Sequence, residues 1–311
     1  MDIFLTTLES VAVLLGLGLL GFWVVSRRVI PENAFDILTP LAIDIALPCL
    51  IFANIIDGFD PAASPDWWTL PLWWAGFMVF AGTLTACLTP LAGKGLRREF
   101  ALALFFRNAI FVPLAVLTGM FGTGSPRIID LFLFTLFFPS LFFGSYHLFF
   151  ASGKRRLEWR RVLNIVLIAT AAAVAMKLSG THRLLPDFAL QAARMMGAAT
   201  IPVLMLILGG SVYVDFKHGE KLYTAEILKF VCAKNILFPL AALGLLLLIK
   251  PSRELALLLL LESAVPPVTA VPVVAARMGG NRNAANQFLV ASFAASLVTI
   301  PVAMALFAAF F

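Results

Sequence analysis

Long apolar runs separated by short polar segments dominate the sequence. A transmembrane helix needs about 20 mostly apolar residues. The runs predict ten such spans, at residues 3–25, 34–56, 67–92, 99–121, 127–150, 162–179, 187–212, 225–249, 254–277 and 285–310. A membrane barrel would instead alternate apolar and polar residues over segments of about ten, and this sequence does not. We therefore expect an all-α integral membrane protein.

The composition agrees with this fold class and excludes several others. Of the 311 residues, 61% are hydrophobic and 13% are charged, which is about half the charged share of a typical soluble domain. This excludes a soluble, a disordered or a disulfide-scaffold protein. The net charge of +6 comes from basic residues in short loops, so it reports membrane topology and indicates membrane lipid, not nucleic acid, as the surroundings.

Lysine and arginine are distributed unevenly between the loops. The odd-numbered loops carry 14 of them and the even-numbered loops carry 5. Because cytoplasmic loops are enriched in these residues, we expect the odd loops in the cytoplasm and both termini in the periplasm of a bacterial inner membrane. The chain begins Met1-Asp2-Ile3 without a basic segment, so we expect the first apolar run to be a span and not a removed signal peptide.

A weak internal repeat divides the chain. An offset of 154 residues pairs Pro48 with Pro202, Pro113 with Pro267, and Asn108 with Glu262. The proline pairs fall in equivalent spans, and a basic segment, 152–161, lies between the halves 1–151 and 162–311. Because each half would hold five helices, the second half must enter the membrane inverted. Inverted repeats of this kind are typical of secondary transporters.

Two proline-containing segments interrupt apolar spans at equivalent places. Arg107–Pro113 lies in the fourth span, and Glu262–Pro272, which contains a Pro-Pro pair, lies in the ninth. Proline removes a backbone donor and blocks the preceding helical turn. Irregular backbone in a membrane survives where it is buried or lines a cavity, and half-helix ends can bind ions of either sign. We expect a binding site here; the alternative is two kinks without a site.

The polar side chains near these breaks are the candidates for chemistry. Glu262 is costly in an apolar span unless it is paired, hydrated or protonated. It could bind Na⁺ or a proton as the coupling ion, or form a permanent ion pair, for which Lys234 is the candidate partner. Arg107 either snorkels to the cytoplasmic surface or clamps a carboxylate. Asn108 can bond a carboxylate or coordinate an ion.

These considerations give three predicted sets of site residues. The substrate-binding set is Arg107, Asn108, Pro113, Pro266, Pro267 and Thr269; the coupling-ion set is Glu262, Asn108 and Lys234; the candidate cavity-lining set is Asp44, Asn54 and Ser140. Asp44 and Asn54 could equally face a dimer seam. We expect no cofactor and no metal other than a candidate Na⁺ near Glu262.

Enzyme motifs are lacking. The sequence has no H-E-x-x-H, C-x-x-C, G-x-S-x-G or Walker A pattern. Gly16-Leu-Gly-Leu-Leu-Gly21 matches a dinucleotide-binding pattern, but it lies inside an apolar span with no strand before it. We interpret it as a site of close helix packing, and we do not expect an enzyme.

Four segments, each weak alone but in the right order, give the chain a family resemblance. They are Ile37-Leu-Thr-Pro-Leu with Ala46-Leu-Pro-Cys-Leu-Ile-Phe-Ala-Asn54; Asn108 with Pro113-Leu; Ala199–Ser211; and Glu262-Ser-Ala-Val-Pro-Pro-Val-Thr-Ala270. On these the chain resembles the auxin efflux carrier family of permeases, which includes bacterial malonate, malate and lactate carriers and plant PIN-type exporters. It differs from the plant carriers in lacking a long central cytoplasmic loop.

The resemblance implies a fold and a mechanism. It implies ten helices in two inverted repeats, with crossing broken helices at spans four and nine. It implies a scaffold of spans 1, 2, 6 and 7, a transport domain of spans 3–5 and 8–10, elevator-like alternating access, and a homodimer formed through the scaffold. Asn108 matches the crossover asparagine that contacts the substrate carboxylate in PIN-type relatives. Glu262 and Asn108 resemble the residues that bind Na⁺ in the more distant bile-acid symporters.

Together these observations predict a secondary active transporter for a small organic anion, a mono- or dicarboxylate, in symport with H⁺ or Na⁺. Arg107, Asn108 and the backbone at 266–269 would hold the anion. One alternative is an uncoupled facilitator or exporter, which never accumulates its substrate. The other is an intramembrane lipid-handling enzyme, for which the sequence offers scattered acids without a motif.

Overall fold

The fold is described from a computed structural model, which describes residues 3–31, 34–122, 124–150, 165–217 and 221–311. All the regular elements in these residues are helical, and seven helical segments are long and apolar enough to cross a membrane. These seven segments are Ile3–Ser26, Ile37–Gly58, Trp67–Leu91, Pro126–Phe149, Asp187–Val214, Thr224–Ile249 and Arg282–Phe310. The protein is thus an all-α integral membrane protein. The basic segment 152–161 lies outside the described residues.

The helices of the first half begin and end close to the expected spans. They are α1 (Ile3–Ser26), α2 (Phe35–Pro40), the π-helical η2 (Leu41–Ala46), α3 (Leu47–Gly58), η3 (Trp67–Thr69), α4 (Leu70–Leu88), η4 (Thr89–Leu91), α5 (Arg97–Phe105), α6 (Phe111–Phe121), α7 (Pro126–Phe134), α8 (Phe138–Ser145) and η5 (Tyr146–Phe149). The expected fourth span is therefore two short helices, α5 and α6.

The helices of the second half also begin and end close to the expected spans. Its helices are α10 (Ile165–Ser179), η6 (Thr181–Leu184), α11 (Asp187–Ala198), α12 (Thr200–Lys217), α13 (Thr224–Val231), the π-helical η7 (Cys232–Leu237), α14 (Phe238–Ile249), α15 (Arg253–Ala264), α16 (Val271–Arg277) and α17 (Arg282–Phe310). The expected ninth span is the pair of short helices α15 and α16.

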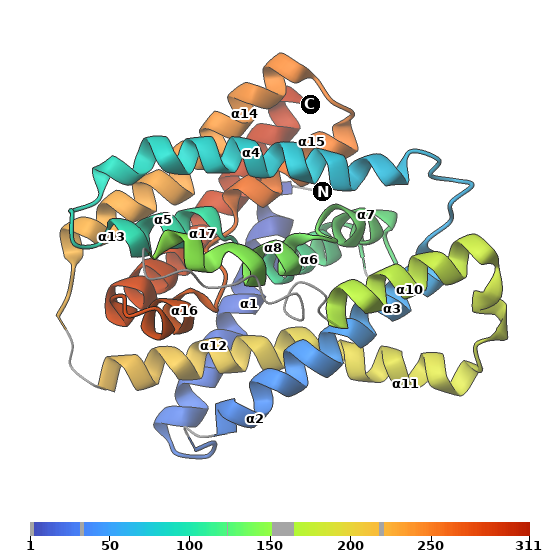
Figure 1. Cartoon of the computed structure of the whole chain (residues 1–311), viewed down its shortest axis with the longest axis horizontal. Helices are drawn as coiled ribbons and strands as arrows, with labels where there is room; N and C mark the ends of the chain where they lie inside the picture. The colour runs from blue at the N-terminus through green and yellow to red at the C-terminus, as the bar shows by residue number, and fades with distance from the viewer. Residues whose placement is uncertain (1–2, 32–33, 123, 151–164, 218–220) are drawn as a thin grey trace.

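The helices form two groups (Figure 1). The two breaks, between α5 and α6 and between α15 and α16, lie between these groups. Along one edge, α3 packs against α10 and α11, and α2 and η2 pack against α12. Along the other edge lie α4, α14 and α15. The helices α5, α6, α8 and α16 lie between these edges, and α1 contacts α12, α17 and α6.

Glycines allow α1 and α12 to cross at backbone contact. A Cβ added to Gly209 would collide with the carbonyl oxygen of Gly18, and one added to Gly21 would collide with the backbone of Leu206. Helices in a membrane gain little from the hydrophobic effect, so close approach through small residues is a principal source of their packing energy. The expected close packing near Gly16–Gly21 is therefore found, although Gly16 itself faces open space.

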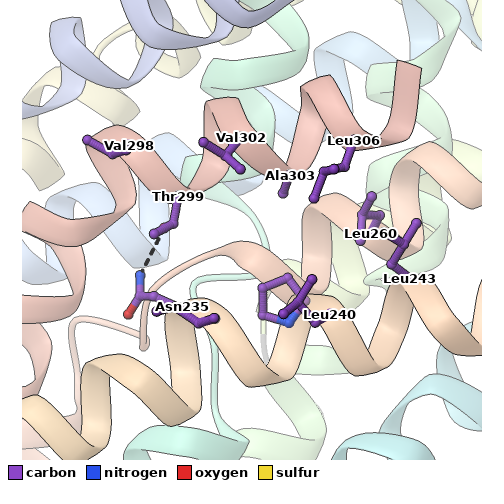
Figure 2. A pocket seen from close by; sticks show the side chains of 11 residues that line it. Asn235, Leu240, Leu243, Leu260, Val298, Thr299, Val302, Ala303 and Leu306 are labelled. Atoms are coloured by element: carbon purple, nitrogen blue, oxygen red, sulfur yellow. Dashed lines mark hydrogen bonds between the residues drawn. The ribbon is translucent and has the colours of Figure 1, made fainter. Parts of the chain in front are cut away.

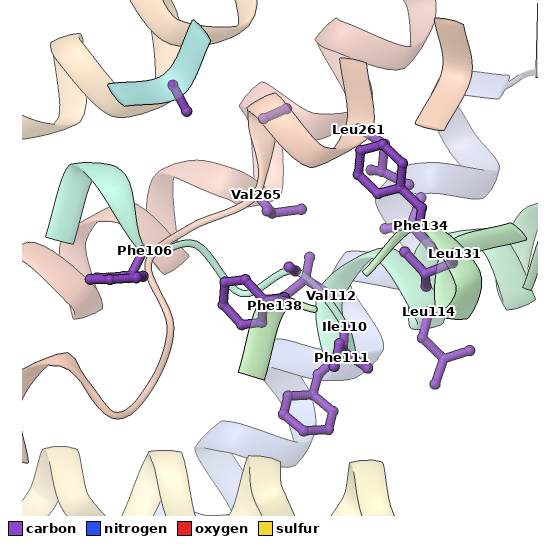
Figure 3. Close-up of a cluster of buried hydrophobic side chains, with 14 of the residues drawn as sticks. Phe106, Ile110, Phe111, Val112, Leu114, Leu131, Phe134, Phe138, Leu261 and Val265 are labelled. Carbon is purple, nitrogen blue, oxygen red and sulfur yellow. The ribbon is translucent and has the colours of Figure 1, made fainter. Parts of the chain in front are cut away.

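Apolar side chains surround the two breaks (Figure 3). Phe106 and Ile110 come from the segment between α5 and α6, and Val265 comes from the segment between α15 and α16; all three are buried. Phe138 of α8 and Leu261 of α15 pack around them. The irregular backbone is thus shielded from lipid, as membrane-embedded loops require.

Candidate functional site

Proline explains why both helices stop. In a continuous helix the ring of Pro113 would clash with the carbonyl of Ala109, and in the structure α5 ends at Phe105 while α6 begins at Phe111. In the other pair, Pro266 and Pro267 lack N–H groups and push the residues before them out of the helical region. Accordingly, Val265 is extended, with φ −71° and ψ 149°.

The two breaks cross and hydrogen-bond to each other. Arg107 and Pro267 form an antiparallel bridge. The N–H of Asn108 donates to the carbonyl of Pro266 at 2.8 Å, and the N–H of Val268 donates to the carbonyl of Phe106 at 3.0 Å. Backbone groups that leave a helix inside a membrane cost several kcal/mol if they stay unpaired, so these bonds stabilise the crossing.

The two breaks correspond at an offset different from that of the proline pairs. Phe111 and Val271, which begin α6 and α16, are 160 residues apart, and so are Arg107 and Pro267, which form the bridge. That offset pairs Asn108 with Val268, and the N–H groups of these two residues make the two crossing bonds. The expected pairing of Asn108 with Glu262 is therefore wrong for the two breaks: Asn108 lies in a break, whereas Glu262 lies in the last turn of α15.

Asn108 uses its side-chain oxygen to hold the start of α6. Its Oδ1 accepts the N–H groups of Phe111 at 3.1 Å and Val112 at 3.4 Å, which lack partners inside the helix. Its Nδ2 has no partner among the described residues, although Asn108 is 1% exposed. A buried donor without a partner is costly, and it is a group that a carboxylate could satisfy.

Arg107 does not snorkel to the membrane surface. The side chain is 1% exposed, and its guanidinium carbon lies 4.3 Å from the ring centre of Phe77 in α4 and 5.6 Å from that of Phe238 in α14. Nη2 donates to the carbonyl of Phe105 at 3.3 Å, while Nε and Nη1 find no partner in the described parts of the chain. The aromatic faces stabilise the cation in place of water, and the side chain is held behind the crossing.

Lys234 and Glu262 complete a buried charge cluster with Arg107. Lys234, on the π-helical η7, is 0% exposed and its Nζ lies 4.7 Å from the ring centre of Phe238. Glu262 is 1% exposed. All three side chains interact electrostatically with one another. In the part of the chain that the structure describes, Lys234 Nζ and Glu262 Oε1 have no hydrogen-bond partner. The cluster thus combines two basic side chains, one acidic side chain and unsatisfied polar atoms.

A neighbouring polar network fixes the π-helical turn that carries Lys234. Asn235 Nδ2 donates to the carbonyl of Ser292 at 3.1 Å. It also donates to Thr299 Oγ1 of α17 at 3.3 Å (Figure 2). The hydroxyl of Ser292 donates back to Asn235 Oδ1 at 2.8 Å. π-Helical turns often occur at functional sites, and this one was missed in the sequence because its residues keep the helical period.

A cavity of about 470 Å³ lies between the two groups of helices. One wall comes from α2, η2 and α12, and the other from α8, η5, the α15–α16 break and α16. Its lining residues are Thr39, Ile43, Phe142, Phe143, Tyr146, Leu204, Ile207, Leu208, Ser211, Thr269, Ala270, Val273, Val274 and Arg277. Thr269 is the predicted site residue that reaches this cavity. Arg277 was interpreted in the sequence only as a loop charge.

The other predicted residues lie elsewhere. Pro113 is buried in the first turn of α6, and the carbonyl of Pro266 is occupied by the crossing bond. Asp44 is exposed on η2, and Asn54 Nδ2 donates to the carbonyl of Leu50 at 2.8 Å within its own helix. Ser140 is buried in α8. These last three are not among the residues that line the cavity.

Comparison with known proteins identifies the family. No curated protein sequence matches the chain with significant similarity. A family model described as membrane transport protein matches residues 6–152 and 154–304, which is nearly the whole chain. That family is the auxin efflux carrier group of permeases. The chain therefore belongs to the membrane transport protein family, and it is an integral membrane transporter.

Proposed function

We propose that this protein carries a small organic anion across the membrane by alternating access, coupled to H⁺ or Na⁺. The observation that carries the proposal is the cavity of about 470 Å³ that reaches Thr269 at the crossing of two broken helices. A break next to a cavity exposes a binding site at mid-membrane depth, which is the arrangement that secondary transporters use.

The charges behind the crossing support an anionic substrate. Arg107 and Lys234 outnumber Glu262, so the cluster has a formal net charge of +1 at a place where the protein screens charges weakly. Asn108 Nδ2, which has no partner among the described residues, adds a hydrogen-bond donor that also favours an anion. In this proposal the substrate contacts Thr269, the excess positive charge of the cluster favours an anion in the adjoining cavity, and Glu262 takes the coupling ion.

The domain movement is also part of the proposal. We take the ten expected spans as two inverted five-helix repeats, with a scaffold of spans 1, 2, 6 and 7 and a transport domain of spans 3–5 and 8–10. The cavity supports this division because α2, η2 and α12 line one wall while α8 and α16 line the other. An elevator-type shift of the second group would carry the crossing from one side of the membrane to the other. The scaffold would form the homodimer contact.

We further propose a bacterial inner-membrane location with both termini in the periplasm. The excess of Lys and Arg in the odd-numbered loops supports this orientation. In this orientation the cavity opens to the cytoplasm, because four of its lining residues lie toward the cytoplasmic ends of their helices: Thr39, Tyr146, Ser211 and Arg277.

The test is uptake of labelled malonate, malate, lactate and indole-3-acetate into proteoliposomes under an imposed H⁺ or Na⁺ gradient. Accumulation above equilibrium under one gradient is the expected result, and it names the coupling ion. Equilibration that ignores both gradients would instead establish an uncoupled facilitator. Absence of flux for every compound, with a lipid-like product bound to the purified protein, would favour a lipid-handling enzyme.

A further inference from the structure

The cavity between the two helix groups has a cation in its lining. Among the described residues that line this cavity, Arg277 is the only charged one, and it is exposed at the end of α16. Within the described residues it has neither an ion-pair partner nor a hydrogen-bond acceptor. A guanidinium free to form a bidentate pair is the usual recognition group for a carboxylate.

The rest of the lining is mostly apolar. Phe142 and Phe143 of α8 face the cavity together with Val273 and Val274 of α16, and the opposite wall adds the aliphatic side chains of Ile43, Leu204, Ile207 and Leu208. The remaining polar groups are three hydroxyls of Thr or Ser and one of Tyr. A second carboxylate placed against these walls would lose its hydration without gaining a cationic partner, which is costly.

We infer that Arg277 binds the substrate carboxylate in the cavity, and that the cavity selects a monocarboxylate carrying an apolar body. This rests on the proposed transport of an organic anion and narrows its substrate class. The carboxylate pairs with Arg277 while the apolar body lies along Phe143 and Val273 toward Thr269. A basic residue in the last turn of α16 also complements the helix carbonyls, but that role affects stability and not the choice of ligand.

The experiment is equilibrium binding of radiolabelled phenylacetate and malonate to the purified full-length protein in detergent, with hexanoate and the neutral hexanol as competitors. We expect phenylacetate to bind more tightly than malonate, hexanoate to compete, and hexanol to fail. Arg277→Gln should weaken phenylacetate binding by at least about tenfold, the loss of one charged hydrogen-bonding partner, and Arg277→Lys should restore part of it. Arg98→Gln, which removes an exposed cation outside the cavity, should change nothing.

A second variant keeps the inference testable if Arg277→Gln is unstable. Val273→Thr preserves side-chain shape on an exposed position of the lining, and it should weaken phenylacetate binding while leaving acetate binding unchanged. Tighter binding of malonate than of phenylacetate, or full phenylacetate affinity in Arg277→Gln, would overturn the inference. Phenylacetate binding without transport would refute the proposed function and leave the assignment of Arg277 standing.

Discussion

Asn108 and Pro266 are joined by a backbone hydrogen bond of 2.8 Å across the point where the two broken helices meet. The bond links a residue of the first half of the chain to one of the second. Together with the bond from Val268 to Phe106, it makes the two breaks one structural unit. The first and second halves of the chain are therefore joined through the backbone at this point.

Asn108 is expected to have two separable roles. Asn108→Ala removes the acceptor for the N–H groups of Phe111 and Val112, which should lower stability by about 1 kcal/mol, as loss of a helix cap does. Asn108→Asp keeps the acceptor and should unfold at a temperature close to that of the wild type. It removes the Nδ2 donor, so we expect anion uptake to fall in both variants. Thermal unfolding and uptake of each variant separate the roles; a stable Asn108→Ala would refute the cap.

Glu262 is expected to matter for both charge balance and coupling. Glu262→Gln leaves Arg107 and Lys234 buried without a counter-charge, which should destabilise the protein by several kcal/mol, on the order of 3–5. Adding Lys234→Met should recover much of that loss, because one cation is then removed as well. Gradient-driven accumulation should be lost in both variants. Unfolding and uptake measurements check this, and accumulation by the double variant would exclude Glu262 as the coupling group.

The chemistry of the charge cluster also bears on the choice of coupling ion. A sodium ion next to Glu262 would need several oxygen ligands, but the neighbouring side chains, Arg107 and Lys234, carry donors and no acceptor atoms. A proton needs the Glu262 carboxylate alone. A proton gradient is therefore expected to drive uptake, and replacing external Na⁺ with choline should leave the initial rate unchanged. Saturable stimulation of uptake by Na⁺ would contradict this view of the cluster.

The contact between α1 and α12 gives a test with a matched control. Gly209→Leu places a side chain against the carbonyl of Gly18, whereas Gly16→Leu, on the same pair of helices, starts from a position where an added Cβ meets nothing within 4 Å. We expect the first variant to unfold at a lower temperature and to purify in lower yield, and the second to resemble the wild type. Equal unfolding temperatures for the two would show that this packing is not required.

The sequence predicted the features that depend on neighbouring residues, namely the helices and the two breaks. Apolar runs placed the helices, and Pro113, Pro266 and Pro267 placed both breaks. The offset between the two breaks could not be predicted from the prolines, because Pro113 lies inside α6 whereas Pro266 and Pro267 lie in the break itself. A match of proline positions therefore misplaces Asn108.

The direction of a side chain depends on helices that are distant in the sequence. Arg107 lies against Phe77 and Phe238, which belong to helices on either side of it in the chain. No local pattern distinguishes that environment from a cavity or from the membrane surface. Arg277 shows the converse: a residue at the end of a span looks like a topological charge until α2 and α12 are seen to face it.

The crossing is held by main-chain atoms, and this separates folding from specificity. The bonds need an N–H at Asn108 and Val268 and a carbonyl at Phe106 and Pro266, which many residue types can supply. Proline is the residue that cannot replace Asn108 or Val268, because it lacks the donor. A side chain such as that of Val268 can therefore change over evolution without loss of its main-chain bond, so that the same backbone can acquire new ligands by substitution alone.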